Sequence, residues 1–209
     1  MRESKLIPFW EITGSVSTLI VIKIDALAFQ SRHPIGISIP QTSITTIADK
    51  TDNTMACPIP EDEAQRLEAL RSYEILDTPP EVDFDALTRV AAHTFDTPAA
   101  VVGLMDAGRL WFKSRLGVDE PQLDRQIAFC AYAIMEPEKT LIVKDLKSDP
   151  RFEDNPLVTQ PPNLRFYAGA PIVARSGHAL GTIAIADVKP RSFGNEQSNV
   201  LRDLSTLVM

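Results

Sequence analysis

The chain has 209 residues, of which 44% are apolar and 23% are charged, and its net charge is −7. This length fits one domain with an added segment, and the composition is that of an ordinary globular protein. With two cysteines in all, the composition excludes a disulfide-rich scaffold, and it also excludes wholesale disorder and collagen-like repeats. The acidic balance argues against a nucleic-acid partner, because binding to phosphates needs a concentrated basic surface.

The charge divides the chain near Met55. Residues 1–54 hold five basic and five acidic groups, so the whole net charge belongs to residues 55–209. No apolar run in the sequence is long enough to span a membrane, and Glu11 interrupts the one stretch that resembles a signal peptide. We expect residues 1–54 to be a poorly ordered extension, or to lie upstream of a protein that starts at Met55. Cysteine usage points to the cytoplasm.

Helices are predicted where apolar residues recur every three or four positions. They cover Pro60 to Tyr73, Asp83 to Phe95, Ile127 to Met135 and a last segment from about Asn195. Acidic residues at the start of the first helix suit the positive end of its dipole. Its apolar face is predicted to consist of Ala64, Leu67 and Leu70. The last helix has a comparable stripe of Leu201, Leu204 and Leu207, and the sequence ends inside it.

Strands are predicted over Ala99 to Met105, Leu110 to Leu116, Leu141 to Val143, Phe166 to Ala174 and Leu180 to Asp187. Tight turns join the first two and the last two, which indicates antiparallel pairing. Residues 117–124 read as a polar loop. Residues 145–163 form a long connection with four prolines, and connections of this length are usually lids or binding loops. Helices at both ends must cover the sheet, which gives an α+β sandwich.

Six motifs follow one another with ordinary spacing over about residues 59–209. They are Arg66-Leu67 with Tyr73 to Thr78, Trp111 to Ser114 with Gly117, Arg125 with Phe129 to Ala131, Asp145 with Asp149 to Phe152 and Asn155 to Val158, Arg165 to Pro171, and Gly181-Thr182. The closing Asp187 with Pro190-Arg191 also fits. Together they resemble a GAF domain of the kind found in bacterial signalling proteins.

The resemblance implies a six-stranded antiparallel sheet flanked by helices, with a small-molecule pocket roofed by the middle helix and the long loop. It also implies a homodimer through the terminal helices. Such a domain is usually the input module of a histidine kinase, a diguanylate cyclase or a phosphodiesterase. No such output motif occurs in this sequence, so the chain is either a stand-alone module or a fragment that is truncated at its C-terminal helix.

Six residues are candidates for ligand binding: Trp111, Phe129, Cys130, Arg151, Phe166 and Tyr167. Aromatic rings offer flat apolar walls, and a tyrosine hydroxyl can orient a ligand. Arginine suits an anion because its planar fork binds two oxygens. Each aromatic residue and the cysteine can equally be part of the core.

The acidic cluster of Asp145, Asp149 and Asp154 with Arg151 allows a metal or phosphate site, or simply turns and structural ion pairs. The structural reading explains every member. No metal and no other cofactor is therefore predicted. Ala184 stands where the family often has a cysteine, which argues further against thiol or metal chemistry.

Three functions remain open at this point. The first is a sensory module without catalysis that binds a small molecule and regulates a signalling output. The second is a small redox enzyme of the free methionine sulfoxide reductase type, with Cys130 as its thiol; this chemistry requires a resolving cysteine, and Cys57 lies before the domain. The third is a dimerisation scaffold with a vestigial pocket.

Overall fold

One sheet of six antiparallel strands organises residues 57–209, the part of the chain that this computed structural model describes. The strands are β1 Ala99–Met105, β2 Arg109–Leu116, β3 Gln122–Asp124, β4 Leu141–Val143, β5 Phe166–Val173 and β6 Ala179–Asp187. Their order across the sheet is β3-β2-β1-β6-β5-β4, so β1 and β6 are central. The predicted fold class is confirmed. The expectations for residues 1–54 and for a start at Met55 lie outside the described residues.

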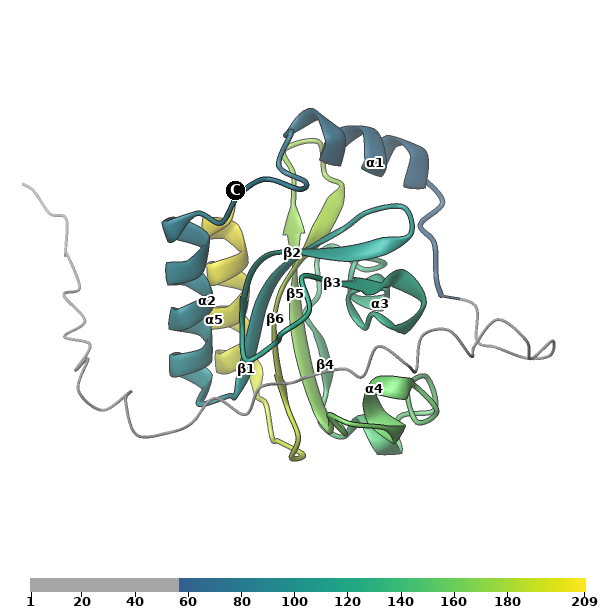
Figure 1. Cartoon of the computed structure of the whole chain (residues 1–209), viewed down its shortest axis with the longest axis vertical. Coiled ribbons are helices and arrows are strands. Elements are labelled where there is room, and N and C mark those ends of the chain that lie inside the picture. Colours follow the sequence, from purple (N-terminus) through teal and green to yellow (C-terminus); the bar gives the residue numbers. More distant parts are fainter. Residues whose placement is uncertain (1–56) are drawn as a thin grey trace, which may run out of the picture. The chain divides into compact units, whose positions relative to one another are not determined.

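Helices lie on both sides of this sheet. The longer ones are α1 Glu63–Ser72, α2 Val82–Phe95 and α5 Asn195–Leu207; the short ones are η4 Arg125–Ile127, α3 Cys130–Ala133, η5 Leu146–Ser148 and α4 Pro156–Thr159. In Figure 1, α2 and α5 lie side by side against one face, α3 and α4 lie on the other, and α1 crosses one end. None of the described helices is long and apolar enough to cross a membrane.

The face covered by α2 and α5 holds one of two apolar clusters. Phe95 of α2 and Leu201 of α5 pack there with the strand residues Val102, Phe166 and Ile183. The stripe predicted on the last helix is used inside the domain, because Leu201 and Leu204 are buried against this sheet. Leu207 alone of the three is exposed. The stripe is therefore wrong as a dimer face, although its helical spacing is correct.

The opposite face packs against a layer of short helices and loops, which we call the roof: residues 125–134 and 145–164. Phe129, Phe152 and Leu157 of the roof join Phe112 and Tyr167 of the sheet in the second apolar cluster. The space between this roof and the sheet is where the resemblance predicts a pocket.

The two central strands approach each other more closely than side chains would allow. Gly181 of β6 pairs with Leu104 of β1. A Cβ atom at Gly181 would lie 2.0 Å from the carbonyl oxygen of Gly103. The glycine of the Gly181-Thr182 motif is thus required by strand packing.

Three predicted segments differ from the structure. Residues 117–124 contain β3, which was predicted as loop because three residues are too few to show an alternating pattern. The helix predicted over Ile127 to Met135 is confined to α3, preceded by the 3₁₀ turn η4. In the first helix Ala64 is exposed and Arg66 is buried, so the buried face includes a charged side chain that hydrophobic spacing does not predict.

Candidate functional site

A small apolar cavity lies between the sheet and the roof. Its volume is about 60 Å³ and all fourteen residues that line it are apolar. Phe112 contributes from the sheet, Phe129 from the start of α3, and Leu157 and Leu164 from the long connection. The cavity therefore occupies the position that the resemblance predicts, under the middle helix and the long loop.

Alanines create the hollow. Ala99 of β1 pairs directly with Ala186 of β6, and Val101 pairs with Ala184. These four residues, together with Ala128 of the roof, line the cavity. The alanine side chains are only methyl groups and are smaller than the other side chains that line the cavity. The roof does not fill the space that they leave.

Beside the cavity, Cys130 forms a buried polar cluster with two hydroxyls. Its sulfur accepts hydrogen bonds from Tyr167 Oη at 3.3 Å and from Thr182 Oγ1 at 3.0 Å. Tyr167 can lie there because residue 169 is a glycine: a Cβ atom at Gly169 would be 2.2 Å from the tyrosine oxygen. All three side chains are buried, and none lines the cavity.

The protonation state of this cluster follows from burial. Burial raises the pKa of the Cys130 thiol, although the hydrogen bonds from Thr182 and Tyr167 oppose it. Burial also raises the pKa of Tyr167 well above its ordinary value, and the neighbouring Cys130 adds to this rise. Both groups therefore stay neutral at pH 7. A thiol nucleophile would need the opposite shift.

The long connection is tied to the rest of the roof through Asn155. Its Nδ2 donates to the carbonyl of Ile127 at 3.0 Å, and its Oδ1 accepts from the backbone N–H of Leu157 at 2.9 Å. The second bond caps the start of α4. One side chain thereby fixes α4 to η4, on either side of the cavity.

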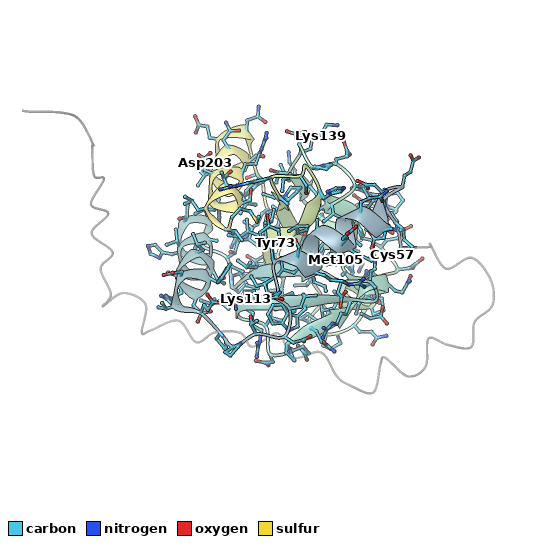
Figure 2. All side chains as sticks on the ribbon, turned by 90° about the horizontal axis from the view of Figure 1, so that it is seen from above. Cys57, Tyr73, Met105, Lys113, Lys139 and Asp203 are labelled. Atoms are coloured by element: carbon cyan, nitrogen blue, oxygen red, sulfur yellow. The ribbon has the colours of Figure 1, made fainter. Side chains whose placement is uncertain are left out.

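A buried ionic cluster connects α1 to the other end of the roof. Glu63 accepts hydrogen bonds from Arg66 Nε at 2.6 Å and from Arg125 Nη1 at 2.5 Å. Both guanidinium side chains are almost wholly buried. Cys57 lies at the same end and its thiol donates to the carbonyl of Arg125 at 3.3 Å. Figure 2 looks down on this end, where Cys57 and Met105 lie by α1; both belong to the roof-side apolar cluster.

The structure brings three of the six predicted site residues together. Phe129 lines the cavity, its ring lies 5.3 Å from that of Tyr167, and Tyr167 contacts Cys130. Trp111 and Phe166 belong to the cluster on the opposite face, under α2 and α5, and do not reach the cavity.

Arg151 also lies away from the cavity. Its guanidinium is half-exposed, pairs with Asp149 at 2.7 Å and stacks over the ring of Phe152 at 4.9 Å. Asp145 pairs with Arg165, and it also accepts from the N–H of Lys147. The acidic cluster is thus built from turns and ion pairs, and no group of residues among 57–209 is arranged to hold a metal ion.

The cavity residues that the sequence analysis missed are the alanines and leucines. Ala184 and Ala186 alternate with isoleucines along β6, so small side chains on one face of this strand are the available signal. Leu157 of α4 and Leu164 lie in the segment that the sequence predicts as a long connection. Nothing in the sequence marks them, because their position depends on how the connection folds back over the sheet.

Comparison with protein families identifies the domain. The family model described as the GAF domain matches residues 79–209. The chain belongs to the GAF family. The match starts after α1, so the buried contact between Glu63 and Arg125 joins a segment outside the match to one inside it.

The relatives differ in how much they share with this chain. A cyclic di-GMP phosphodiesterase of Pseudomonas aeruginosa is 36% identical over 153 residues, which are 73% of this chain. The aligned part is 26% of that relative, so the chain spans about a quarter of its length.

Two solved structures share the fold. The GAF domain of an Acinetobacter phosphoenolpyruvate-protein phosphotransferase is 16% identical, covering 69% of this chain and 90% of that chain, with a TM-score of 0.50. The PixJ GAF domain of Thermosynechococcus elongatus, in its blue-light absorbing form, is 12% identical, covering 66% and 83%, also with a TM-score of 0.50. At such identities the likeness shows the fold alone.

Proposed function

We propose that residues 57–209 act as a regulatory module that binds a small molecule under the roof and thereby controls a signalling output. The observation that carries this is the apolar cavity, because its walls come from the central strands and from a roof that is tied to α1. Occupancy of the cavity would act on Phe129, and Phe129 is four residues from Arg125 and its contact with Glu63.

The output is proposed to be an enzyme of cyclic di-GMP turnover. The relative named as a cyclic di-GMP phosphodiesterase supports this choice, since this chain aligns with about a quarter of it. A diguanylate cyclase falls within this same class of enzyme, and a histidine kinase is the alternative output. We place the module in the cytoplasm, where reduced thiols such as the free Cys57 and Cys130 persist. Recovery in a periplasmic fraction would contradict this.

We propose no catalysis for this chain. The buried, neutral Cys130 supports this, because a redox thiol must meet its substrate as a thiolate. The assay is reduction of free methionine sulfoxide. Turnover by the wild type that disappears in Cys130→Ser would overturn the proposal.

A ligand panel tests the regulatory proposal. The full chain is heated with cyclic di-GMP, cyclic AMP, cyclic GMP and a set of common metabolites and volatile apolar compounds. A ligand of the native state raises the melting temperature as its concentration exceeds Kd. A rise that is lost in the cavity-filling variant Ala184→Leu supports the proposal. If no compound changes the melting temperature, ligand sensing is wrong.

A second function, dimerisation, is favoured by exposed apolar residues at one end of the α2–α5 pair. Val82 at the start of α2 is 73% exposed and Leu207 at the end of α5 is 68% exposed. The helices run in opposite directions, since Phe95 at the end of α2 contacts Phe193 just before α5. The start of α2 and the end of α5 therefore lie at the same end of the pair (Figure 1). Dimerisation through this end of the helix pair does not depend on whether the cavity binds a ligand.

A further inference from the structure

The cavity offers a ligand no polar partner. Every residue that lines it has an apolar side chain, and the strand backbone around it is engaged in the ladders of β1, β2 and β6. A ligand that carries a charge or an unpaired hydrogen-bonding group would lose its hydration without compensation. The lining therefore selects against phosphates, carboxylates and amides.

The buried polar cluster beside Phe129 is already satisfied internally. Tyr167 and Thr182 both donate to Cys130, and the space over Gly169 holds the tyrosine in that direction. None of these three residues lines the cavity. A ligand would have to break this buried cluster to gain a hydrogen bond from it, and leaving such groups unpaired is costly.

Size restricts the ligand further. The cavity measures about 60 Å³, whereas sites for drug-sized ligands measure roughly 300–1,000 Å³. An engineered apolar cavity of roughly 150 Å³ stays dry and binds benzene or xenon. A cavity of less than half that volume fits a molecule of a few heavy atoms.

We infer that this cavity is a binding site for a neutral apolar molecule of a few heavy atoms, such as a dissolved gas or a short hydrocarbon. The inference rests on the proposed function and names its ligand class. Alanines of both central strands set the volume, and Phe129, Leu157 and Leu164 line it from the roof side.

Xenon is the first probe, followed by the matched pair ethane and methanol, which have the same number of heavy atoms. The full chain is labelled at alanine methyl groups and titrated under gas pressure or with solvent. We expect saturable NMR shifts at Ala99, Ala184 and Ala186 with xenon and ethane. Ala168 and Ala170, on the other face of the sheet, serve as internal controls and should not shift. Methanol should need at least about tenfold more ligand for half-saturation, because its hydroxyl would be buried unpaired.

Two variants of the cavity and one control variant keep the experiment decisive. Ala184→Leu fills the cavity and should abolish the shifts; Ala186→Val, at a partly buried position, is a milder substitution if the first does not fold. The control is Ala64→Leu, the same change from alanine to leucine at an exposed position of α1, and it should leave the shifts unchanged.

The outcomes separate this inference from the proposed function. Absence of saturable shifts at the cavity alanines in the folded wild type overturns the inference, as does equal binding of methanol and ethane. If cyclic di-GMP or another charged compound raises the melting temperature and Ala184→Leu prevents it, the ligand class is wrong while the regulatory module stands. If xenon and ethane bind as expected, the ligand class is supported even where the output remains unknown.

Discussion

At the scale of single residues, Glu63 is the one carboxylate that pairs with both Arg66 and Arg125 in the buried ionic cluster. Three guanidinium nitrogens of these arginines have no hydrogen-bond partner among the described residues. Burial by itself would raise the pKa of Glu63, but the hydrogen bonds from the two arginines outweigh it and hold the pKa below its ordinary value. The carboxylate is therefore ionised wherever the fold is intact at neutral pH.

Replacing Glu63 should be costly. Glu63→Gln keeps the shape but removes the charge between two buried cations, so we expect a loss of about 3 kcal/mol in the free energy of unfolding. Glu68→Gln, at an exposed position of the same helix, should change it by less than about 0.5 kcal/mol. Urea denaturation measures both. Equal effects of the two variants would mean that the buried cluster does not hold α1.

Asp145 should govern part of the acid sensitivity. The hydrogen bonds from Arg165 lower the pKa of its carboxyl from 3.8 to about 2, despite some burial. A pKa lowered in the folded state stabilises the protein above the unfolded-state value, and this contribution is lost as the pH falls from about 4 towards 2.

The measurement is the urea midpoint of wild type and Asp145→Asn from pH 6 to pH 2. Glu63, Asp77 and Asp149 also have lowered pKa values, so the wild type should lose stability in acid for several reasons. The difference between wild type and Asp145→Asn should shrink below about pH 4. A difference that stays constant down to pH 2 would contradict the assignment.

At the scale of elements, single side chains join parts of the chain that are too short to hold themselves. Helix α4 has four residues and η4 has three, so neither is stable in isolation. Asn155 links them, as described above. Arg191 does the same for longer elements: it donates to the carbonyls of Phe95 and Asp96 at the end of α2 and pairs with Asp187 of β6.

Asn155→Ala should loosen the roof without unfolding the sheet. The variant loses an N-cap and a hydrogen bond between elements, which together are worth about 1–2 kcal/mol. Amide hydrogen exchange should accelerate over residues 156–165 and remain slow in β1 and β6.

Asn199→Ala is the matched control, since Asn199 is exposed in the middle of α5. It should leave exchange in the roof unchanged and stabilise α5 slightly, because alanine has the higher helix propensity. If exchange accelerates uniformly across the domain in Asn155→Ala, the roof is not a separate unit.

At the scale of the whole molecule, the two faces of the sheet have different roles. The α2–α5 face holds the apolar cluster that includes Trp111 and Phe166. Lys113 beside it binds Thr78, Pro79 and Glu81 in the connection between α1 and α2. The roof face contains the cavity.

If the chain dimerises through the exposed end of α2 and α5, Leu207→Glu should weaken the dimer by about tenfold to a hundredfold, the usual effect of losing one or two kcal/mol at a central contact. Light scattering at several micromolar concentrations measures this. Ile59→Glu, at an apolar residue that is 62% exposed and precedes α1, should have no effect. A monomeric wild type at these concentrations would exclude the dimer.

The sequence by itself determined the fold and most element boundaries. Residues 141–143 were predicted as a strand with the observed bounds, and the strands at Ala99 and Phe166 start where they were predicted. Apolar runs and alternation encode these elements locally, so no tertiary information is needed to find them. Serial motifs then identified the family, although several motif residues, including Lys113, Gly181 and Arg191, hold the structure together.

Tertiary structure alone decided which residues face the cavity. Trp111 and Phe129 look equally suited to bind a ligand in the sequence, yet they lie on opposite faces of the sheet. Shifting one residue along a strand changes the face, and a bulge between Val102 and Gly103 alters the register of β1 against β2. The cavity exists because no side chain fills the space beside Ala99, Ala184 and Ala186. Such a space depends on the three-dimensional packing of distant segments. The alternating alanines of β6 indicate a strand face with small side chains, but they do not reveal whether the roof fills the space above it.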